Sequence, residues 1–271
     1  MAEDANNLYV ASAFSGGATD VNQVAKIGGA VTPYASAYAR DIAVNSASLF
    51  WPAFDTSLVR ATKGGGTPSA FYSTDKTAGI AADDANVYTV DVTAGSVLAI
   101  SVGAGGTTPL ATATGASRVA VDSSAVYWST QSSGLFRVLK VGGAATPIAG
   151  QGQGEKVIDF AVAGSAIVSL QEDQTSSFSL LSTPTSGGPQ TTLAAISPGP
   201  SGSESRIAAD TNDTFVCEGG VYRLPAGGAV NEIESANQHE CLDIVADPAN
   251  IFWLEGGGTG EQSARIYRLA R

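Results

Sequence analysis

The sequence predicts an all-β protein: a seven-bladed β-propeller of four-stranded antiparallel blades, with three strands in the last blade. A segment that begins with Asp or a residue in its place and continues into an apolar and aromatic run occurs seven times. Its copies start at residues 4, 45, 83, 122, 163, 210 and 247, which are 41, 38, 39, 41, 47 and 37 residues apart. A Gly-Gly pair follows in six copies, and the chain has 32 Gly in all. Strands separated by turn signals, at a period of about 40 residues, are typical of propeller blades.

The copy that starts at residue 122 illustrates the expected strands. An apolar run at residues 118–121 precedes the Asp, and an aromatic strand follows it within residues 122–128. A third strand covers 135–139, a Gly-Gly turn comes next, and a fourth strand covers 146–149. We name these strands A to D. A single blade cannot bury both of its faces, so blades are expected to stack against one another.

The whole chain, residues 1–271, is expected to be one domain. The blades are expected at about 1–40, 41–78, 79–117, 118–158, 159–205, 206–242 and 243–271. Blade 7 reaches its third strand at 265–269 and then stops, which leaves strand C as an outer edge. Exposed edges invite pairing with another chain. We therefore expect a monomer in which edge-strand pairing at blade 7 is possible.

The segment at residues 122–128, Asp-Ser-Ser-Ala-Val-Tyr-Trp, with the strand and Gly-Gly pair that follow, resembles the repeats of YWTD and NHL propellers. It is also similar to related bacterial secreted propellers, and the resemblance extends over essentially the whole chain. The resemblance implies the fold and no single activity, because such propellers include receptors, adhesins, scaffolds and some enzymes.

Composition disfavours several classes of partner. The net charge is -11 and the pI about 4.4, so the chain repels nucleic acid and anionic lipid. No apolar run reaches the length of a membrane span, so no membrane insertion is expected. The N-terminus lacks the basic and apolar regions of a signal peptide, and we expect such a peptide to have been removed.

Catalytic motifs are scarce. The chain has one His, no Gly-x-Ser-x-Gly elbow and no calcium-loop pattern, so we expect no cofactor and no metal. The repeated Asp could form a cation-binding ring, but its presence in most blades favours a cap on the A–B turn. Cys217 and Cys241 end and begin strands on the same face, so a disulfide is favoured over two buried thiols. A disulfide indicates an extracytoplasmic location: periplasmic, cell-surface or secreted.

The B–C and D–A loops vary in length and lie on one face, which we expect to carry function. Glu172, Glu218 and Glu255 belong to the B–C loops of this face. The candidate binding residues, on this face and at the mouth of the central channel, are Trp51, Phe54, Asp41, Arg118, Asp159, Arg206, His239, Glu240 and Asp243. Mixed signs among the charged residues favour mutual pairing as the simpler interpretation.

Three functional hypotheses follow. The leading one is an exported, non-enzymatic binding or scaffold module for an unknown protein or small-molecule ligand, without catalytic residues. The alternative is a propeller enzyme, a lyase or hydrolase, with its site at the channel mouth. For that site the sequence offers His239 and Glu240 as a histidine and a carboxylate. The third is an assembly protein that pairs through its open edge strand.

Overall fold

The computed structural model describes most of the chain. The described residues are 1–11, 20–36, 39, 41–53, 57–73, 76–130, 134–149, 156–196, 205–218, 220–234, 241–256 and 264–271. They form two compact units. Unit 1 comprises Met1–Trp128 and Arg137–Thr146, and unit 2 comprises Ser129–Phe136 and Pro147–Arg271. The prediction of a single domain stays a prediction.

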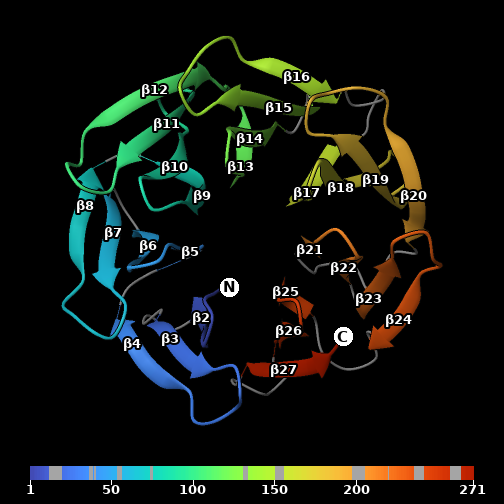
Figure 1. The fold of residues 1–271 in the computed structure, drawn as a ribbon, viewed down its shortest axis with the longest axis horizontal. Coiled ribbons are helices and arrows are strands. Elements are labelled where there is room, and N and C mark those ends of the chain that lie inside the picture. The colour runs from blue at the N-terminus through green and yellow to red at the C-terminus, as the bar shows by residue number, and fades with distance from the viewer. Residues whose placement is uncertain are drawn as a thin grey trace. The chain divides into compact units, whose positions relative to one another are not determined.

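Unit 1 contains blades 1 to 3, each a four-stranded antiparallel sheet in chain order (Figure 1). Blade 1 consists of β1 (Ala2–Glu3), β2 (Asn7–Ala11), β3 (Asp20–Ala25) and β4 (Thr32–Ser36). Blade 2 consists of β5 (Ala43–Val44), β6 (Ser48–Ala53), β7 (Ser57–Thr62) and β8 (Ser69–Ser73). Blade 3 consists of β9 (Thr77–Ala82), β10 (Asn86–Asp91), β11 (Ser96–Ser101) and β12 (Thr107–Thr112).

Blade 4 contains residues of both units and is again a four-stranded sheet. Its strands are β13 (Ala116–Val121), β14 (Ala125–Thr130), β15 (Gly134–Leu139) and β16 (Thr146–Ala149). The turn between β15 and β16 shows why the Gly-Gly pair recurs. Gly142 and Gly143 have φ angles of 85° and 129°, which side-chain-bearing residues rarely adopt.

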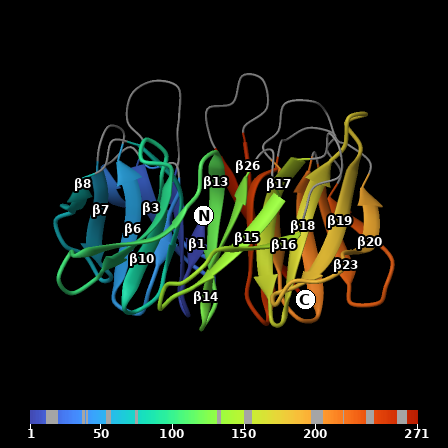
Figure 2. The same ribbon diagram turned by 90° about the horizontal axis from the view of Figure 1, so that it is seen from above.

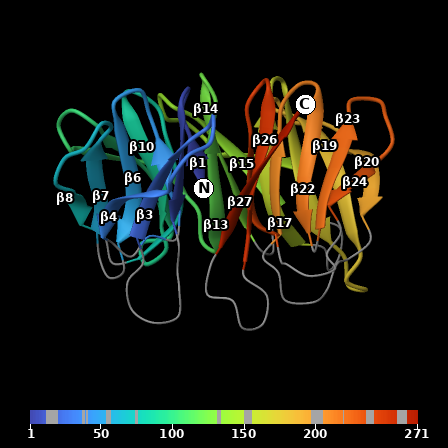
Figure 3. The ribbon, with the colours of Figure 1, turned by 90° about the horizontal axis from the view of Figure 1, so that it is seen from below.

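Unit 2 contains blades 5 to 7, and the strands of blade 5 run side by side (Figure 2). Blade 5 consists of β17 (Lys156–Ala163), β18 (Ala166–Glu172), β19 (Phe178–Pro184) and β20 (Thr191–Ile196). Blade 6 consists of β21 (Arg206–Ala209), β22 (Asp213–Glu218), β23 (Gly220–Pro225) and β24 (Asn231–Glu234) (Figure 3). Blade 7 consists of β25 (Cys241–Ala246), β26 (Asn250–Glu255) and β27 (Arg265–Ala270).

The predicted fold class is confirmed. The described residues form seven blades, six with four strands and the last with three, and contain no helix. Accordingly, this part of the chain has no helix long and apolar enough to cross a membrane.

Apolar side chains fill the layers between successive blades within each unit. In unit 1, Tyr9 and Trp51 belong to one layer between blades 1 and 2, and Phe50 belongs to the next, between blades 2 and 3. Adjacent residues of a strand point to opposite faces, so the neighbouring aromatics Phe50 and Trp51 serve different layers, as the sequence predicts. In unit 2, Val216 and Phe215 divide in the same way between the layers toward blades 5 and 7.

The repeated Asp caps the A–B turn, which supports the structural interpretation. In blade 3, Asp83 Oδ1 accepts hydrogen bonds from the backbone N–H groups of Ala85 and Asn86 at 2.8 and 2.7 Å. Its Oδ2 accepts the hydroxyl of Tyr88 at 2.9 Å. Burial alone would raise the pKa of Asp83, but the hydrogen bonds from Lys140 and these groups outweigh it and lower the pKa.

The same carboxylates also join neighbouring blades. A basic side chain just after strand C of the next blade forms an ion pair with this Asp. Lys140 Nζ lies 2.7 Å from Asp83 Oδ2, and Lys63 Nζ lies 3.2 Å from Asp4 Oδ2. In unit 2, Arg271 has this role and binds Asp210. One residue therefore fixes both a turn and the packing of two blades, which explains its recurrence.

Replacing Asp83 by Ala should destabilise the protein by about 2 kcal/mol, because it leaves two turn amides and Lys140 without their acceptor. Urea unfolding at neutral pH measures the loss. Asp91→Ala is the matched control, since the Asp91 side chain accepts one exposed hydrogen bond, from Ala94. Equal losses for the two variants would contradict the role assigned to Asp83.

Candidate functional site

Two carboxylates end the B strands of neighbouring blades in unit 2. Glu172 is the last residue of β18 and Glu218 is the last residue of β22. Both strands run in the same sense within their blades, so the two residues lie at the same end of the layer between blades 5 and 6.

The pleat of the strands turns these two side chains toward each other. Val216, two residues before Glu218, packs in the layer between blades 5 and 6, and so does Leu170, two residues before Glu172. Because residues i and i+2 share a face of a strand, both glutamates project into this same layer.

Glu218 is a buried acid. Its side chain is only 5% exposed, and Oε2 has no hydrogen-bond partner among the described residues. Burial disfavours the charged form and, together with the negative charge of Glu172, raises the pKa of Glu218 to about 7. Near neutral pH, a large fraction of this carboxyl group therefore retains its proton.

Glu172 has the opposite environment. Lys156, its cross-strand partner at the start of β17, places Nζ 2.5 Å from Glu172 Oε2. Tyr222 of β23 packs against the same layer, and its pKa is raised by burial and by the negative charges of Glu232 and Glu218.

This arrangement places a buried acid that retains its proton near a carboxyl group that forms an ion pair with Lys156. Two carboxyl groups in different environments are the usual components of acid–base catalysis. The acid can donate a proton to a leaving oxygen while the carboxylate accepts a proton or stabilises positive charge. Among the described residues, the pair Glu218 and Glu172 is thus the best candidate for chemistry.

Further buried polar groups occupy the same repeat position as Glu218. Gln171 and Glu255 are also the ninth residues of their copies, and they are 3% and 5% exposed. Glu255 accepts a hydrogen bond from Trp253 Nε1 at 2.7 Å, so one of its oxygens is satisfied. This pairing distinguishes Glu255 from Glu218.

The disulfide between Cys217 and Cys241 is confirmed, with Cα atoms 5.5 Å apart. It joins β22 to β25 and is buried in the layer between blades 6 and 7. Cys217 directly precedes Glu218, so the cross-link anchors the end of the strand that carries the acid. A disulfide of this kind fits an oxidising, extracytoplasmic compartment.

The candidate binding residues of the sequence are distributed over both units. In unit 1, Trp51 is fully buried in the layer between blades 1 and 2, and Asp41 accepts the N–H of Ile42 at 2.9 Å. Arg118 lies half-buried on β13. Phe54, His239 and Glu240 lie outside the described residues. A binding role for these residues stays a prediction.

The remaining candidates lie in unit 2 on successive A strands or at their start. Asp159, Arg206 and Asp243 occupy equivalent positions on the neighbouring strands β17, β21 and β25. Asp159 accepts the backbone N–H of Ile207 in the next blade at 3.1 Å, and Asp243 accepts the N–H of Ile244 at 2.9 Å. These contacts are structural, and they place the three side chains on adjacent strands.

Sequence reasoning assigned Glu172 and Glu218 to loops and gave them no chemical role. The structure makes them strand ends, and their interaction arises from the packing of two blades. The sequence contained one signal for Glu218. The ninth residue of copies 5, 6 and 7 is polar, namely Gln171, Glu218 and Glu255, where a buried strand would otherwise be apolar.

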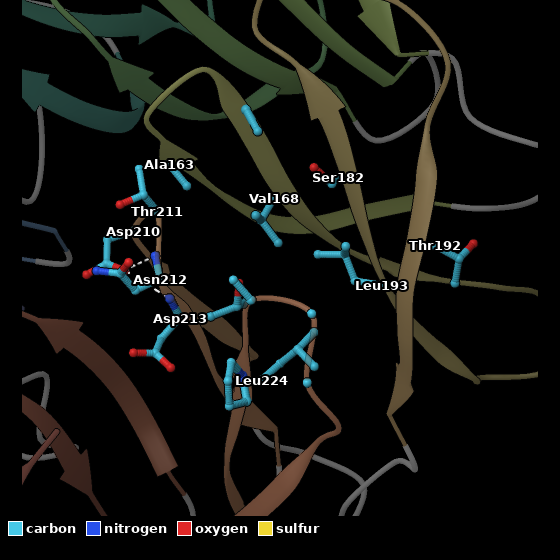
Figure 4. A pocket seen from close by; sticks show the side chains of 16 residues that line it. Ala163, Val168, Ser182, Thr192, Leu193, Asp210, Thr211, Asn212, Asp213 and Leu224 are labelled. Carbon is cyan, nitrogen blue, oxygen red and sulfur yellow. Dashed lines mark hydrogen bonds between the residues drawn. The ribbon is translucent and has the colours of Figure 1, made fainter.

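A hollow of about 330 Å³ lies at the other end of the same layer, among the A–B and C–D turns (Figure 4). Apolar side chains such as Val168 and Leu224 form much of its wall, and Asp210 and Asp213 lie at one side. Arg271 binds both carboxylates, and Arg223 Nε lies 2.8 Å from Asp213 Oδ1. Arginine side chains therefore compensate the carboxylates in this hollow, whereas Glu218 Oε2 has no hydrogen-bond partner among the described residues.

Comparison with known proteins identifies no family. No protein-family model matches the chain, and no curated protein matches it. The similarity to YWTD and NHL repeats thus remains a resemblance.

Solved structures match the fold at low identity. An oligogalacturonate lyase from Vibrio parahaemolyticus has a TM-score of 0.71 and 10% identity, over 97% of this chain and 86% of that chain. An oligogalacturonate lyase in complex with manganese has a TM-score of 0.71 and 11% identity, over 98% of this chain and 85% of that chain. A chain of a nidogen/laminin complex has a TM-score of 0.56 and 14% identity, over 82% and 96%.

An extracellular domain from B. thetaiotaomicron has a TM-score of 0.62 and 11% identity, over 96% of this chain and 38% of that chain. At these identities the matches show the fold. The manganese complex raises the question of a metal, but the described residues hold no group of three His, Cys, Asp or Glu that could bind one. We therefore derive no step through a metal ion.

The likeness to oligogalacturonate lyases corrects the functional prediction. The expectation of a non-enzymatic binding or scaffold module is wrong, and the alternative of a propeller enzyme is the better supported. The error has a physical reason. Scarce sequence motifs count against an enzyme only if the catalytic groups are close in sequence, whereas the candidate pair, Glu218 and Glu172, comes from different blades.

Proposed function

We propose that this protein is a propeller enzyme, a lyase or hydrolase, that cleaves glycosidic bonds, with Glu218 as its general acid. The observation that carries the proposal is the buried Glu218, whose Oε2 lacks a hydrogen-bond partner among the described residues and whose pKa is raised to about 7. An acid that keeps its proton near neutral pH is what departure of a sugar oxygen requires.

The two reaction classes share this step. In hydrolysis, the acid protonates the glycosidic oxygen while a carboxylate acts as base or nucleophile at the sugar carbon. In elimination, a base removes the proton beside the carboxylate of a uronic acid unit, the electron pair forms the new double bond, and the leaving oxygen again takes a proton from an acid. Glu172, which forms an ion pair with Lys156, is the proposed carboxylate partner in either case.

The charge of the site favours the hydrolytic reaction, on an uncharged or weakly charged oligosaccharide, over elimination, which needs a uronate. The similar solved structures include lyases of oligogalacturonate, a polyanion, but this chain carries a net charge of -11 and its site contains two carboxyl groups. Both features repel a polyanion. With the buried disulfide, the proposed location is the periplasm, the cell surface or the surroundings of the cell.

The test measures cleavage of cello-, xylo- and manno-oligosaccharides and of oligogalacturonate by the wild-type chain and by Glu218→Gln. We expect new reducing ends from an uncharged substrate, and a loss of about 10²–10⁴-fold in Glu218→Gln, because Gln cannot donate the proton. Ultraviolet absorbance of an unsaturated product from oligogalacturonate identifies elimination, and new reducing ends without that absorbance identify hydrolysis.

Glu234→Gln is the matched control, because Glu234 is an exposed residue of the same blade. We expect it to keep wild-type activity. Full activity of Glu218→Gln would contradict the role of Glu218, and cleavage of no saccharide in the panel would contradict the proposed reaction.

A further inference from the structure

Large side chains fill the turn end of the layer between blades 6 and 7. The ring of Phe215, the sixth residue of copy 6, lies under two guanidinium groups, with Arg271 Cζ and Arg223 Cζ 5.1 and 5.9 Å from its centroid. Arg271 also binds Asp210, the first residue of the copy. An aromatic ring, an Asp and two bases thus occupy this end of the layer.

The equivalent positions are small in the layer between blades 5 and 6. Copy 5 begins with Ala163 instead of Asp, and its sixth residue is Val168, whereas the sixth residue of every other copy is Tyr or Phe. Ser182 lies opposite Val168, just as Arg223 lies opposite Phe215 in blade 6. Three large side chains are therefore replaced in one layer.

The fourth replacement is Ala226, which stands where blade 7 has Arg271. Each donates its backbone N–H to the third residue of its copy, Ala226 to Asn212 and Arg271 to Ala249. The four small residues, one at each replaced position, all line the hollow of about 330 Å³ (Figure 4). The hollow therefore takes the place that an aromatic ring and its charged neighbours have in the next layer.

A buried hydroxyl group faces the same hollow. Thr214 is 5% exposed and lines the hollow, and its hydroxyl has no hydrogen-bond partner among the described residues. It is the fifth residue of copy 6, and the other copies have Leu, Val or Ile at this position. A hydroxyl can both donate and accept a hydrogen bond, so a polar group of a ligand could pair with it.

The rest of the wall favours a neutral ligand. Leu224 and Leu193 are apolar, and the carboxylates of Asp210 and Asp213 at one side are already bound by arginines. The volume lies at the lower end of the range for small-molecule sites, which are mostly apolar with a few polar groups.

We propose that this hollow binds a small neutral aromatic molecule with a hydroxyl group, of the phenol class. Its ring would pack against Val168 and Leu224, and its hydroxyl would pair with Thr214. A saccharide fits less well, because hydroxyl groups around its whole ring would meet the apolar wall. The hollow lies at the opposite end of the layer from Glu218, so this proposal is independent of the proposed reaction.

The experiment titrates the full chain with phenol and, separately, with toluene, and follows amide shifts by nuclear magnetic resonance. We expect saturable binding of phenol with a Kd of about 1 mM or tighter, and shift changes at the residues that line the hollow. Thr214→Val introduces the residue that copy 3 has at this position. It should weaken phenol binding about fivefold and leave toluene binding unchanged, because toluene has no hydroxyl.

A second variant fills the hollow. Val168→Phe restores the aromatic ring of the other copies and should abolish binding of both probes, whereas Ile27→Phe adds the same ring at an exposed turn of unit 1 and should leave binding unchanged. The Thr214→Val comparison decides the question if Val168→Phe does not fold. Absence of saturable phenol binding, shift changes confined to other parts of the chain, wild-type affinity in a folded Val168→Phe, or equal weakening of both probes by Thr214→Val would overturn the proposal.

Discussion

Glu218→Gln should stabilise the protein above pH 7 by up to about 3 kcal/mol. The pKa of Glu218 rises from 4.5, its ordinary value, to about 7 in the folded protein, mainly because the side chain is buried. Between these values the folded state binds more protons than the unfolded state, so stability falls as the pH rises. Above about pH 7 the full cost of the buried charge is present, and a neutral Gln avoids it.

Urea unfolding at pH 5 and pH 8 measures this effect. At pH 5 the wild-type residue is protonated when folded, so the variant and the wild type should have similar stability; at pH 8 the variant should be the more stable. Glu234→Gln, at an exposed position of β24, should show no such difference. Equal stability of Glu218→Gln and the wild type at pH 8 would contradict the assigned environment.

The same variant separates a catalytic role from a structural one. A residue kept for catalysis at a cost in stability should give a more stable and inactive protein when it is neutralised. A residue kept for stability would give a less stable protein. Loss of activity together with a gain in stability at pH 8 therefore supports the catalytic role of Glu218.

Replacing both Cys217 and Cys241 by Ala should lower the free energy of unfolding by about 3 kcal/mol. The disulfide closes a loop with a sequence separation of 24, and cross-linking reduces the conformational freedom of the unfolded chain. Both residues are buried, so the loss of the sulfur atoms also reduces packing in the layer between blades 6 and 7.

Thermal and urea unfolding, with and without a reducing agent, measure this second effect. Reduction should bring the wild type close to the double variant and should leave the double variant unchanged. A double variant as stable as the oxidised wild type would show that packing alone holds β22 and β25 together.

The repeat made the fold predictable from the sequence. Each copy contains its own turn signals and apolar positions, so local residues such as Asp83 and Gly142 specify the A–B and C–D turns without information from distant segments. The pairing of Cys217 with Cys241 followed in the same way, because the strand order of a blade places both residues at the same end.

The candidate site could not be predicted in this way. Glu172 and Glu218 belong to different copies, and each is an ordinary polar residue beside a loop when read alone. Only the packing of blade 5 against blade 6 buries Glu218 and brings Glu172 near it. Glu172 forms its ion pair with Lys156 within blade 5. The sequence by itself determines the blades, because their signals are local. The tertiary structure decides that Glu218 keeps its proton, because desolvation and the distance between charges exist only after the blades have packed.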